Sequence, residues 1–191
     1  MGFAYSACIY IRSVGKNGIV STRLLTAKSR VAPIQTLSIP RLELCSAVLL
    51  SHLYQTVMLH LNINVNPFFW SDSTITLHWL HNPPSNYTTF MANRVAKVQR
   101  LTEGGIWNHV GGFENPVDLI SRGSDPRELT NIALRWKGPP WLSSDQADLP
   151  TMATVPGVQE FAPEIIEAKP RLLAAVTQSD VPENVSSVTR R

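Results

Sequence analysis

Residues 67–80 most constrain the fold, because they join an aromatic run to a polar turn and a second apolar segment. The run Phe68–Trp70 follows a proline and is bulky, which is typical of a buried strand. Ser71-Asp72-Ser73 suits a strand end and a helix cap, since short oxygen-bearing side chains accept free backbone N–H groups. The apolar residues that follow fit a short helix or a second strand, and the polar cap favours the helix.

Asp72 therefore lies at the carboxyl end of a strand, where open α/β sheets place their chemistry. Aspartate is also a common N-cap, so a purely structural role explains the same position. Spacing alone leaves both interpretations open.

The chain has 191 residues, enough for one domain with a core plus a tail. It contains no run of about 18 apolar residues and no visible signal peptide, so we expect an intracellular protein, cytoplasmic or nuclear, without a membrane partner. Cys8 and Cys45 are expected to be reduced thiols, and no Cys or His cluster has zinc spacing.

The charge is unevenly distributed. Residues 1–140 carry 13 basic and 7 acidic side chains, whereas residues 141–191 carry 4 basic and 7 acidic ones. A modestly basic globular part suggests a polyanionic partner.

The chain opens with patterns typical of antiparallel strands. Residues 3–12 predict a strand, Asn17-Gly18 a hairpin turn, and residues 19–27 the returning strand. Residues 28–33 are expected to leave the sheet, and a third short strand is expected near residues 35–38. Together they predict an antiparallel N-terminal meander.

A long helix is predicted from about Arg41 to Leu61, with Pro40 in its first turn. Its first half is apolar nearly all round, which indicates a central helix. Glu43 is anomalous, because helical spacing places it on one face with Ala47 and Leu50. An ionised carboxylate there needs a partner or a metal; pairing with Arg41 and the helix dipole would be the structural explanation.

Residues 90–101 predict a basic amphipathic helix. Arg94, Lys97 and Arg100 lie on its outer face or edge. They are either an ordinary solvated face or a stripe that contacts phosphates.

The last part of the domain is expected to hold a short strand at 106–110, a flexible loop at 111–114, and a helix over 115–123 that includes Asp118. A further short helix should run from Asp125 towards Trp136, followed by a terminal clasp at 138–142. Residues 143–191 are rich in Pro, Ser, Thr, Ala, Val and Glu, and we expect a mostly disordered tail.

Three carboxylates stand out in these patterns: Glu43 on the central helix, Asp72 at a strand end, and Asp118 at a helix start. Carboxylates gathered at one sheet edge repel each other unless a divalent cation lies among them, and Mg²⁺ prefers such oxygen ligands. Two ions about 4 Å apart can activate water and stabilise the leaving oxygen of a phosphodiester. The order of elements is that of the ribonuclease H fold, a mixed α/β sheet with flanking helices.

Six ordered motifs also resemble the ribonuclease H-like region of BEL/Pao retrotransposon polyproteins, a region often labelled a Pao retrotransposon peptidase. The resemblance covers roughly residues 1–142, which we expect to form the domain. The motifs are Lys28-Ser29-Arg30-Val31-Ala32-Pro33, Ile39-Pro40-Arg41-Leu42-Glu43-Leu44, Trp70-Ser71-Asp72-Ser73, Asn93-Arg94-Val95, the segment from Asn115 to Gly123, and Gly138-Pro139-Pro140-Trp141-Leu142.

The resemblance implies that Glu43, Asp72 and Asp118 are the second, third and fourth ligands of Mg²⁺ or Mn²⁺. The family's first ligand, an Asp in an Asp-Ala-Ser segment, has no match here, so we expect an N-terminally truncated fold and little activity unless the chain is extended upstream. The loop His of retroviral relatives is also absent from residues 111–114, and His109 on the preceding strand is expected to be structural.

The first functional hypothesis is therefore a fragment of a retroelement pol polyprotein, acting beside its reverse transcriptase and integrase. Its ancestral activity would be metal-dependent hydrolysis of RNA in RNA–DNA hybrids, with Arg94, Lys97 and Arg100 holding phosphates. The alternative is a non-catalytic, domesticated nucleic-acid-binding module. An aspartic peptidase is disfavoured, because Asp72-Ser73 is followed by Thr74 and no Asp-Thr-Gly or Asp-Ser-Gly element occurs.

Overall fold

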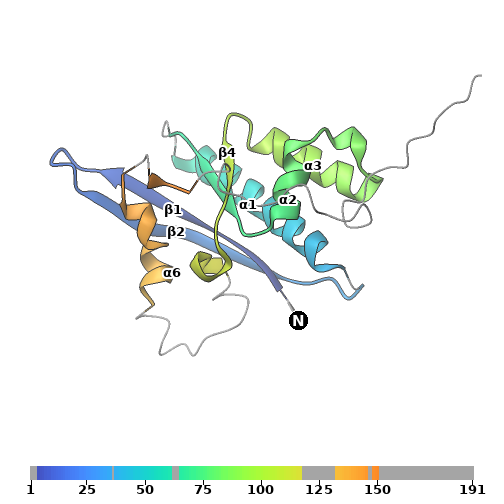
Figure 1. Cartoon of the computed structure of the whole chain (residues 1–191), viewed down its shortest axis with the longest axis horizontal. Coiled ribbons are helices and arrows are strands. Elements are labelled where there is room, and N and C mark those ends of the chain that lie inside the picture. The colour runs from blue at the N-terminus through green and yellow to red at the C-terminus, as the bar shows by residue number, and fades with distance from the viewer. Residues whose placement is uncertain (1–3, 36, 62–64, 118–131, 146–147, 151–191) are drawn as a thin grey trace, which may run out of the picture.

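The computed structural model describes residues 4–35, 37–61, 65–117, 132–145 and 148–150. Within these residues the chain forms an antiparallel strand pair, a parallel strand pair and a group of helices (Figure 1). The long hairpin runs across the molecule, and α2 and α3 lie together towards one end of it. The mixed α/β fold class is confirmed; in the described part the two strand pairs form separate two-stranded sheets.

The N-terminal hairpin consists of β1 (Ala4–Val14) and β2 (Val20–Val31), paired from Ala4 opposite Val31 to Val14 opposite Val20. Its turn uses the predicted Asn-Gly pair. Gly18 has a φ of 78°, which glycine adopts without steric cost, and the Asn17 side chain accepts a hydrogen bond from the Ile19 N–H at 3.2 Å. The turn therefore has the local chemistry that the sequence indicated.

Two details of the predicted meander are wrong. Residues 28–31 do not leave the sheet, because β2 continues through Val31 and these residues pair with residues 4–7 of β1. No third strand forms in the described residues of 32–38. Gln35 and Ser38 are exposed and Leu37 is only partly buried, so the described residues of this segment make little of the apolar contact that a strand needs.

Helix α1 (Ile39–Leu61) begins with Pro40 at its second residue, as predicted. It contacts β1 and α3 extensively, and α2 less so. Leu44, Ala47 and Leu49 are buried, and Val48 and Leu50 are partly buried. Packing on several sides explains why the first half of the helix is apolar nearly all round.

By length and composition alone, α1 is sufficient to cross a membrane, which the sequence analysis did not anticipate. One such helix is weak evidence for a membrane span, because the core helix of a globular domain passes the same test. Its contacts with the hairpin and with α3 account for its apolar character.

The parallel pair consists of β3 (Phe68–Ser71) and β4 (Ile106–His109). Between them the chain forms α2 (Thr74–His81), a 3₁₀ turn at Pro84–Asn86 and α3 (Thr89–Leu101), which is the crossover that parallel strands require. The predicted strand, short helix and amphipathic helix are all confirmed.

Aromatic rings join this pair to α1. The Phe69 ring lies 5.0 Å from the Trp107 ring and 5.2 Å from the Tyr54 ring, centroid to centroid. Gly105 makes this packing possible, because a Cβ there would collide with the Phe69 ring. The core cluster consists of Leu44, Ala47, Phe69, Leu77, Trp79, Leu80, Tyr87, Met91, Val95, Val98 and Trp107.

The C-terminal elements lie against the hairpin, as the predicted clasp requires. They are α6 (Ala133–Lys137) and a 3₁₀ turn at Pro140–Ser143. Arg12 of β1 donates hydrogen bonds to the Leu142 carbonyl at 3.0 Å and to the Ser144 carbonyl at 2.6 Å. Thr22 of β2 donates to the Lys137 carbonyl at 2.7 Å.

Contacts also continue beyond residue 142. Leu149 is buried, and the indole of Trp70 donates to the Pro150 carbonyl at 3.1 Å. The domain boundary at 142/143 stays a prediction, and the disorder expected of the tail concerns residues that lie outside the described ones from 151 onward.

Replacing Leu44 by alanine should lower the free energy of unfolding by about 2–5 kcal/mol, because its fully buried side chain lies in the core. Leu59→Ala on the same helix is the matched control. Its side chain is 79% exposed, so we expect a change within about 0.5 kcal/mol. Urea denaturation followed by circular dichroism measures both, and equal losses would contradict the central position of α1.

Candidate active site

Glu43 and Asp72 line one small cavity of about 70 Å³, although they are distant in sequence. The cavity lies where α1, β1, the end of β3 and the segment after β4 meet. Its lining residues are Ser6, Ala7, Cys8, Glu43, Ser46, Ala47, Leu50, Trp70, Ser71, Asp72, Trp107, Asn115 and Val117. The structure thus brings together two of the three carboxylates that the sequence singled out.

The turn after β3 assigns the helix cap to Ser73 rather than to Asp72. The Ser73 hydroxyl accepts a hydrogen bond from the Thr76 N–H at 3.1 Å, and Ser73 is the N-cap of α2. The Ser71 hydroxyl accepts from the Ser73 N–H at 3.2 Å, which fixes the turn from its other side. The cap therefore does not explain why residue 72 is an aspartate.

Glu43 is half-buried and shares the cavity wall with Ala47 and Leu50 of the same helix. The first turn of α1 contains no acidic residue, so Glu43 lies beyond the part of the helix where the dipole stabilises a negative charge most. This weakens one of the two structural explanations for Glu43, and pairing with Arg41 stays open.

Asp118 lies outside the described residues, so its position is untested. The residues directly before it are well placed, however. Asn115 accepts a hydrogen bond from the Val117 N–H at 3.1 Å through its side-chain oxygen, and helical structure begins at Pro116 as predicted. Asn115 and Val117 both line the cavity.

The donor set suits a hard cation only in part. Among the described residues no group of three or more His, Cys, Asp or Glu side chains could hold a metal. The cavity does offer two carboxylates, and Mg²⁺ is often held by one or two carboxylates with waters and substrate phosphates completing its shell. The described residues therefore supply two carboxylate ligands to this cavity, and any further protein ligand would lie outside them.

Cys8 and His109 do not add chemistry to this cavity. Burial raises the pKa of the Cys8 thiol to about 12, so the thiol stays protonated and is a poor nucleophile. His109 lies on β4 opposite Ser71 and is not among the cavity-lining residues, which fits the structural role expected for it.

Residues 112–114, expected to be a flexible loop, form a 3₁₀ turn.

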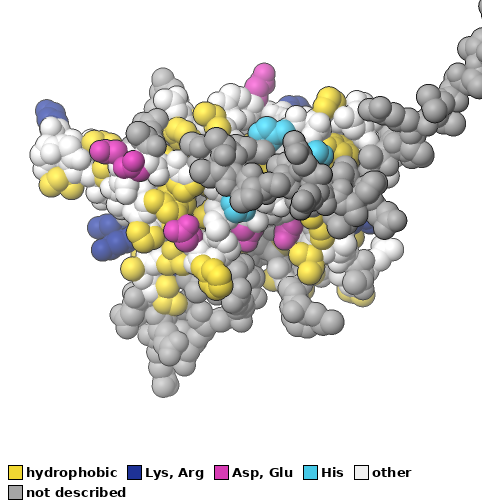
Figure 2. All heavy atoms as spheres, in the orientation of Figure 1, with side chains coloured by type: hydrophobic (Ala, Val, Ile, Leu, Met, Phe, Trp, Pro, Cys, Tyr) yellow, Lys and Arg dark blue, Asp and Glu magenta, His cyan; other side chains and the backbone are white. Residues whose placement is uncertain are grey.

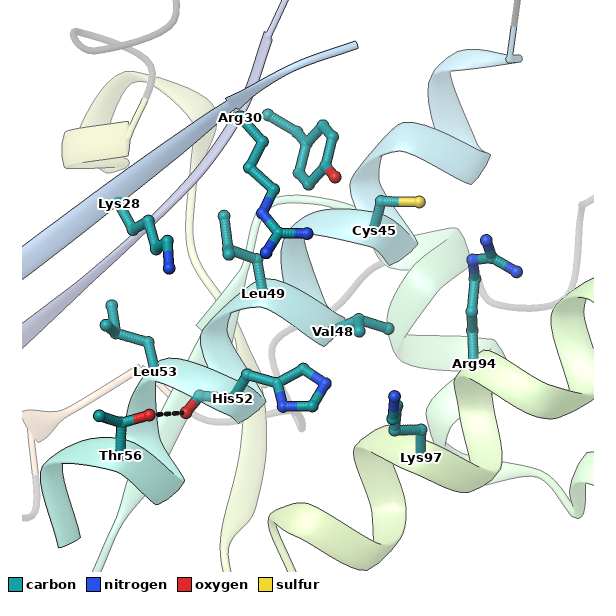
Figure 3. Close-up of a pocket in the computed structure, with 11 residues that line it drawn as sticks. Lys28, Arg30, Cys45, Val48, Leu49, His52, Leu53, Thr56, Arg94 and Lys97 are labelled. Atoms are coloured by element: carbon teal, nitrogen blue, oxygen red, sulfur yellow. Dashed lines mark hydrogen bonds between the residues drawn. The ribbon is translucent and has the colours of Figure 1, made fainter. Parts of the chain in front are cut away.

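A second hollow of about 460 Å³, here called the basic groove, lies between β2, α1 and α3 (Figure 3). It is lined by Tyr5, Lys28, Arg30, Cys45, Val48, Leu49, His52, Leu53, Thr56, Arg94 and Lys97. Arg94 and Lys97 were predicted to contact phosphates. Arg100 was too, but it is exposed and lies outside the set of lining residues.

The sequence analysis missed the contribution of β2 to this groove. Lys28 and Arg30 are two residues apart on a strand, so their side chains point to the same face. The signal was present, but the analysis had placed residues 28–33 outside the sheet. His52 was missed because a single histidine on a helix has no spacing pattern.

Burial and the positive charges in and beside the groove lower the pKa of His52. Its pKa is lowered from the ordinary value by burial, and further by the positive charges of Lys97, Arg30, Arg100 and Lys28. The face shown in Figure 2 differs in charge from the basic groove. Most of its visible carboxylates lie within the face, whereas the Lys and Arg side chains lie at its edges.

Residues 3–73 match the family model described as the Pao retrotransposon-like RNaseH-like domain. The matched segment includes both Glu43 and Asp72 and ends before α2. It supports the resemblance drawn from the sequence, and the observed elements are consistent with a ribonuclease H-like fold. No curated protein and no solved structure matches the chain.

Alanine substitutions separate the two neighbouring residues of the β3–α2 turn. Ser73→Ala should cost about 1 kcal/mol of unfolding free energy, because it removes the N-cap of α2. Asp72→Ala should change stability by less than about 0.5 kcal/mol, since Ser73 rather than Asp72 caps α2. Denaturant titrations of both variants measure the difference, and a larger loss for Asp72→Ala would show that its role is structural.

Proposed function

We propose that this chain, which carries a Pao retrotransposon RNase H-like region, derives from a pol polyprotein domain that hydrolyses RNA in RNA–DNA hybrids. The observation that carries the proposal is the shared cavity of Glu43 and Asp72, two carboxylates from different elements. Val117, the residue before Asp118, lines the same cavity, which supports Asp118 as the third carboxylate.

Glu43 and Asp72 would hold Mg²⁺ or Mn²⁺ in this cavity, with Asp118 as the further ligand. When bound, such an ion activates water and stabilises the leaving oxygen of a phosphodiester. The chain's own contribution is rigid placement: the hydroxyls of Ser71 and Ser73 fix the turn that carries Asp72. Ala47 and Leu50 give the cavity an apolar wall, which lowers the local dielectric and so strengthens charge interactions there.

We expect the activity of the chain as printed to be low. The resemblance implies four acidic ligands, of which the sequence supplies three. The residues of β1 that line the cavity are Ser6, Ala7 and Cys8, and none carries a carboxylate. The cavity thus lacks the acidic group that the first strand supplies in the family.

The partners that follow from this lineage are an RNA–DNA hybrid and the other parts of the polyprotein, reverse transcriptase and integrase. An intracellular location, cytoplasmic or nuclear, follows from the same lineage. Arg94, Lys97 and Arg100 on α3 are the side chains that we propose for contacts with nucleic-acid phosphates.

A second candidate function is a non-catalytic module that binds nucleic acid. The basic groove favours it, because its cations come from β2 and α3 and lie apart from the carboxylate cavity. Binding that is insensitive to Mg²⁺ and to Glu43→Gln would support this candidate.

Manganese binding tests the carboxylate cavity directly. We expect Glu43→Gln and Asp72→Asn each to weaken Mn²⁺ binding at least about tenfold, because each removes a charged ligand. Glu103→Gln, an exposed glutamate just after α3, and Asp145→Asn are the matched controls and should bind Mn²⁺ like the parent. Paramagnetic relaxation of water protons measures the affinities. Equal affinity for all four variants would overturn the proposed metal site.

Cleavage of a labelled RNA–DNA hybrid with Mg²⁺ or Mn²⁺ tests the level of activity. We expect little product, with no difference between the parent and Asp72→Asn. Robust cleavage that Asp72→Asn abolishes would contradict the expected inactivity, although it would support the site.

A further inference from the structure

Helix α1 presents the carboxylate cavity and the basic groove on opposite faces. Successive residues of a helix are rotated by 100°, so Glu43, Ala47 and Leu50 form one face. Cys45 and His52 line the groove and lie about half a turn away from that face. The groove is therefore a separate surface rather than an extension of the cavity.

The charged side chains that line the groove are all cationic or can become so. Lys28 and Arg30 come from β2, His52 from α1, and Arg94 and Lys97 from α3. Among the residues that the structure describes, the lining contains no aspartate or glutamate. Figure 3 shows Lys28 and Arg30 on one side, Arg94 and Lys97 on the other, and the His52 ring between them. Such a surface is complementary to a row of negative charges.

The floor of the groove is apolar and its size limits the occupant. Val48, Leu49 and Leu53 lie along α1 between the two cationic walls. The volume of about 460 Å³ is in the range of sites that hold a small ligand, which suits the sugar-phosphate backbone of one strand rather than a whole duplex. Tyr5 adds an aromatic ring of the kind on which bases stack.

We propose that the basic groove binds the sugar-phosphate backbone of a single nucleic-acid strand, without a metal ion and independently of the carboxylate cavity. This inference deepens the nucleic-acid part of the proposed function. It changes the predicted contact set, because Lys28, Arg30 and His52 join Arg94 and Lys97, whereas Arg100 lies outside the groove.

His52 makes the affinity depend on pH. The charges that act on it are those of Lys28 and Arg30 of β2 and of Lys97 and Arg100 of α3. Arg94 of α3 and Tyr5 of β1 line the same groove. Burial and those charges lower the pKa of His52 in the free protein. A bound phosphate adds negative charge and raises that pKa, so binding is stronger below the free-state pKa and this gain is lost as the pH rises through the bound-state pKa.

Fluorescence anisotropy with a labelled single-stranded DNA oligonucleotide in EDTA tests the groove, using the full chain. If Lys28, Arg30, Arg94 and Lys97 each neutralise one phosphate, log affinity should fall with log salt with a slope of about −3. Lys28→Gln together with Arg30→Gln should reduce the slope to about −1.5 and weaken binding about tenfold or more. Both residues are exposed, so the folded state should be kept, which circular dichroism verifies.

Arg23→Gln is the matched control. Arg23 is an exposed arginine of the same strand that does not line the groove, so this variant should bind like the parent. Equal losses for Arg23→Gln and the double variant would overturn the proposal, because they would show only a general charge effect. Tighter binding of a duplex than of a single strand would also overturn it.

The pH dependence gives a second readout. Between pH 5.5 and 8 the parent should lose about three- to tenfold in affinity, and His52→Gln should remove most of this change. An unchanged pH profile in His52→Gln would show that the strand does not lie against this residue.

The same assays keep the two proposals apart. Strand binding that survives EDTA and Glu43→Gln, with no Mn²⁺ bound at the cavity, would overturn the metal site and leave the groove supported. Binding that needs Mg²⁺ and is lost in Glu43→Gln would place the nucleic acid at the cavity and overturn the groove.

Discussion

The contact among Tyr54, Phe69 and Trp107 holds the two halves of the fold together. It joins α1 to both strands of the parallel pair through ring pairs of about 5 Å, a separation at which aromatic pairs contribute about 0.5–1.5 kcal/mol beyond their buried area. Phe69 is three residues before Asp72, and Tyr54 lies on the face of α1 that carries Glu43. The rings therefore fix the distance between the two elements that supply the carboxylates.

Neither carboxylate caps a helix in the described structure. The cap of α2 is made by Ser73, and Glu43 lies past the first turn of α1. A half-buried acidic side chain costs stability unless an ion pair, a hydrogen bond or a metal compensates its charge. Burial of the core, in which Leu44 and Leu77 are fully buried, offsets this loss of stability.

Most elements could be predicted because their signals are local: Asn17-Gly18 defines the hairpin, Pro40 the start of α1, and the apolar period of residues 90–101 the inner face of α3. The end of β2 could not, because the residues after Ala27 are polar and remain in the strand only through pairing with β1. That error also concealed Lys28 and Arg30 as groove residues. Glu43 and Asp72 were predicted as one site through the order of motifs, since no local pattern shows that they meet; Asp118 stays a prediction.

Because α1 separates the cavity from the groove, the two surfaces have no side chain in common within the described part of the chain. Substitutions that erase the carboxylates leave the opposite wall of the helix untouched, and changes in the cations leave the acidic pocket untouched. Because α1 lies between them, the carboxylate cavity and the basic groove can change independently. Loss of the carboxylate cavity would therefore leave the cationic surface on the other side of α1 intact.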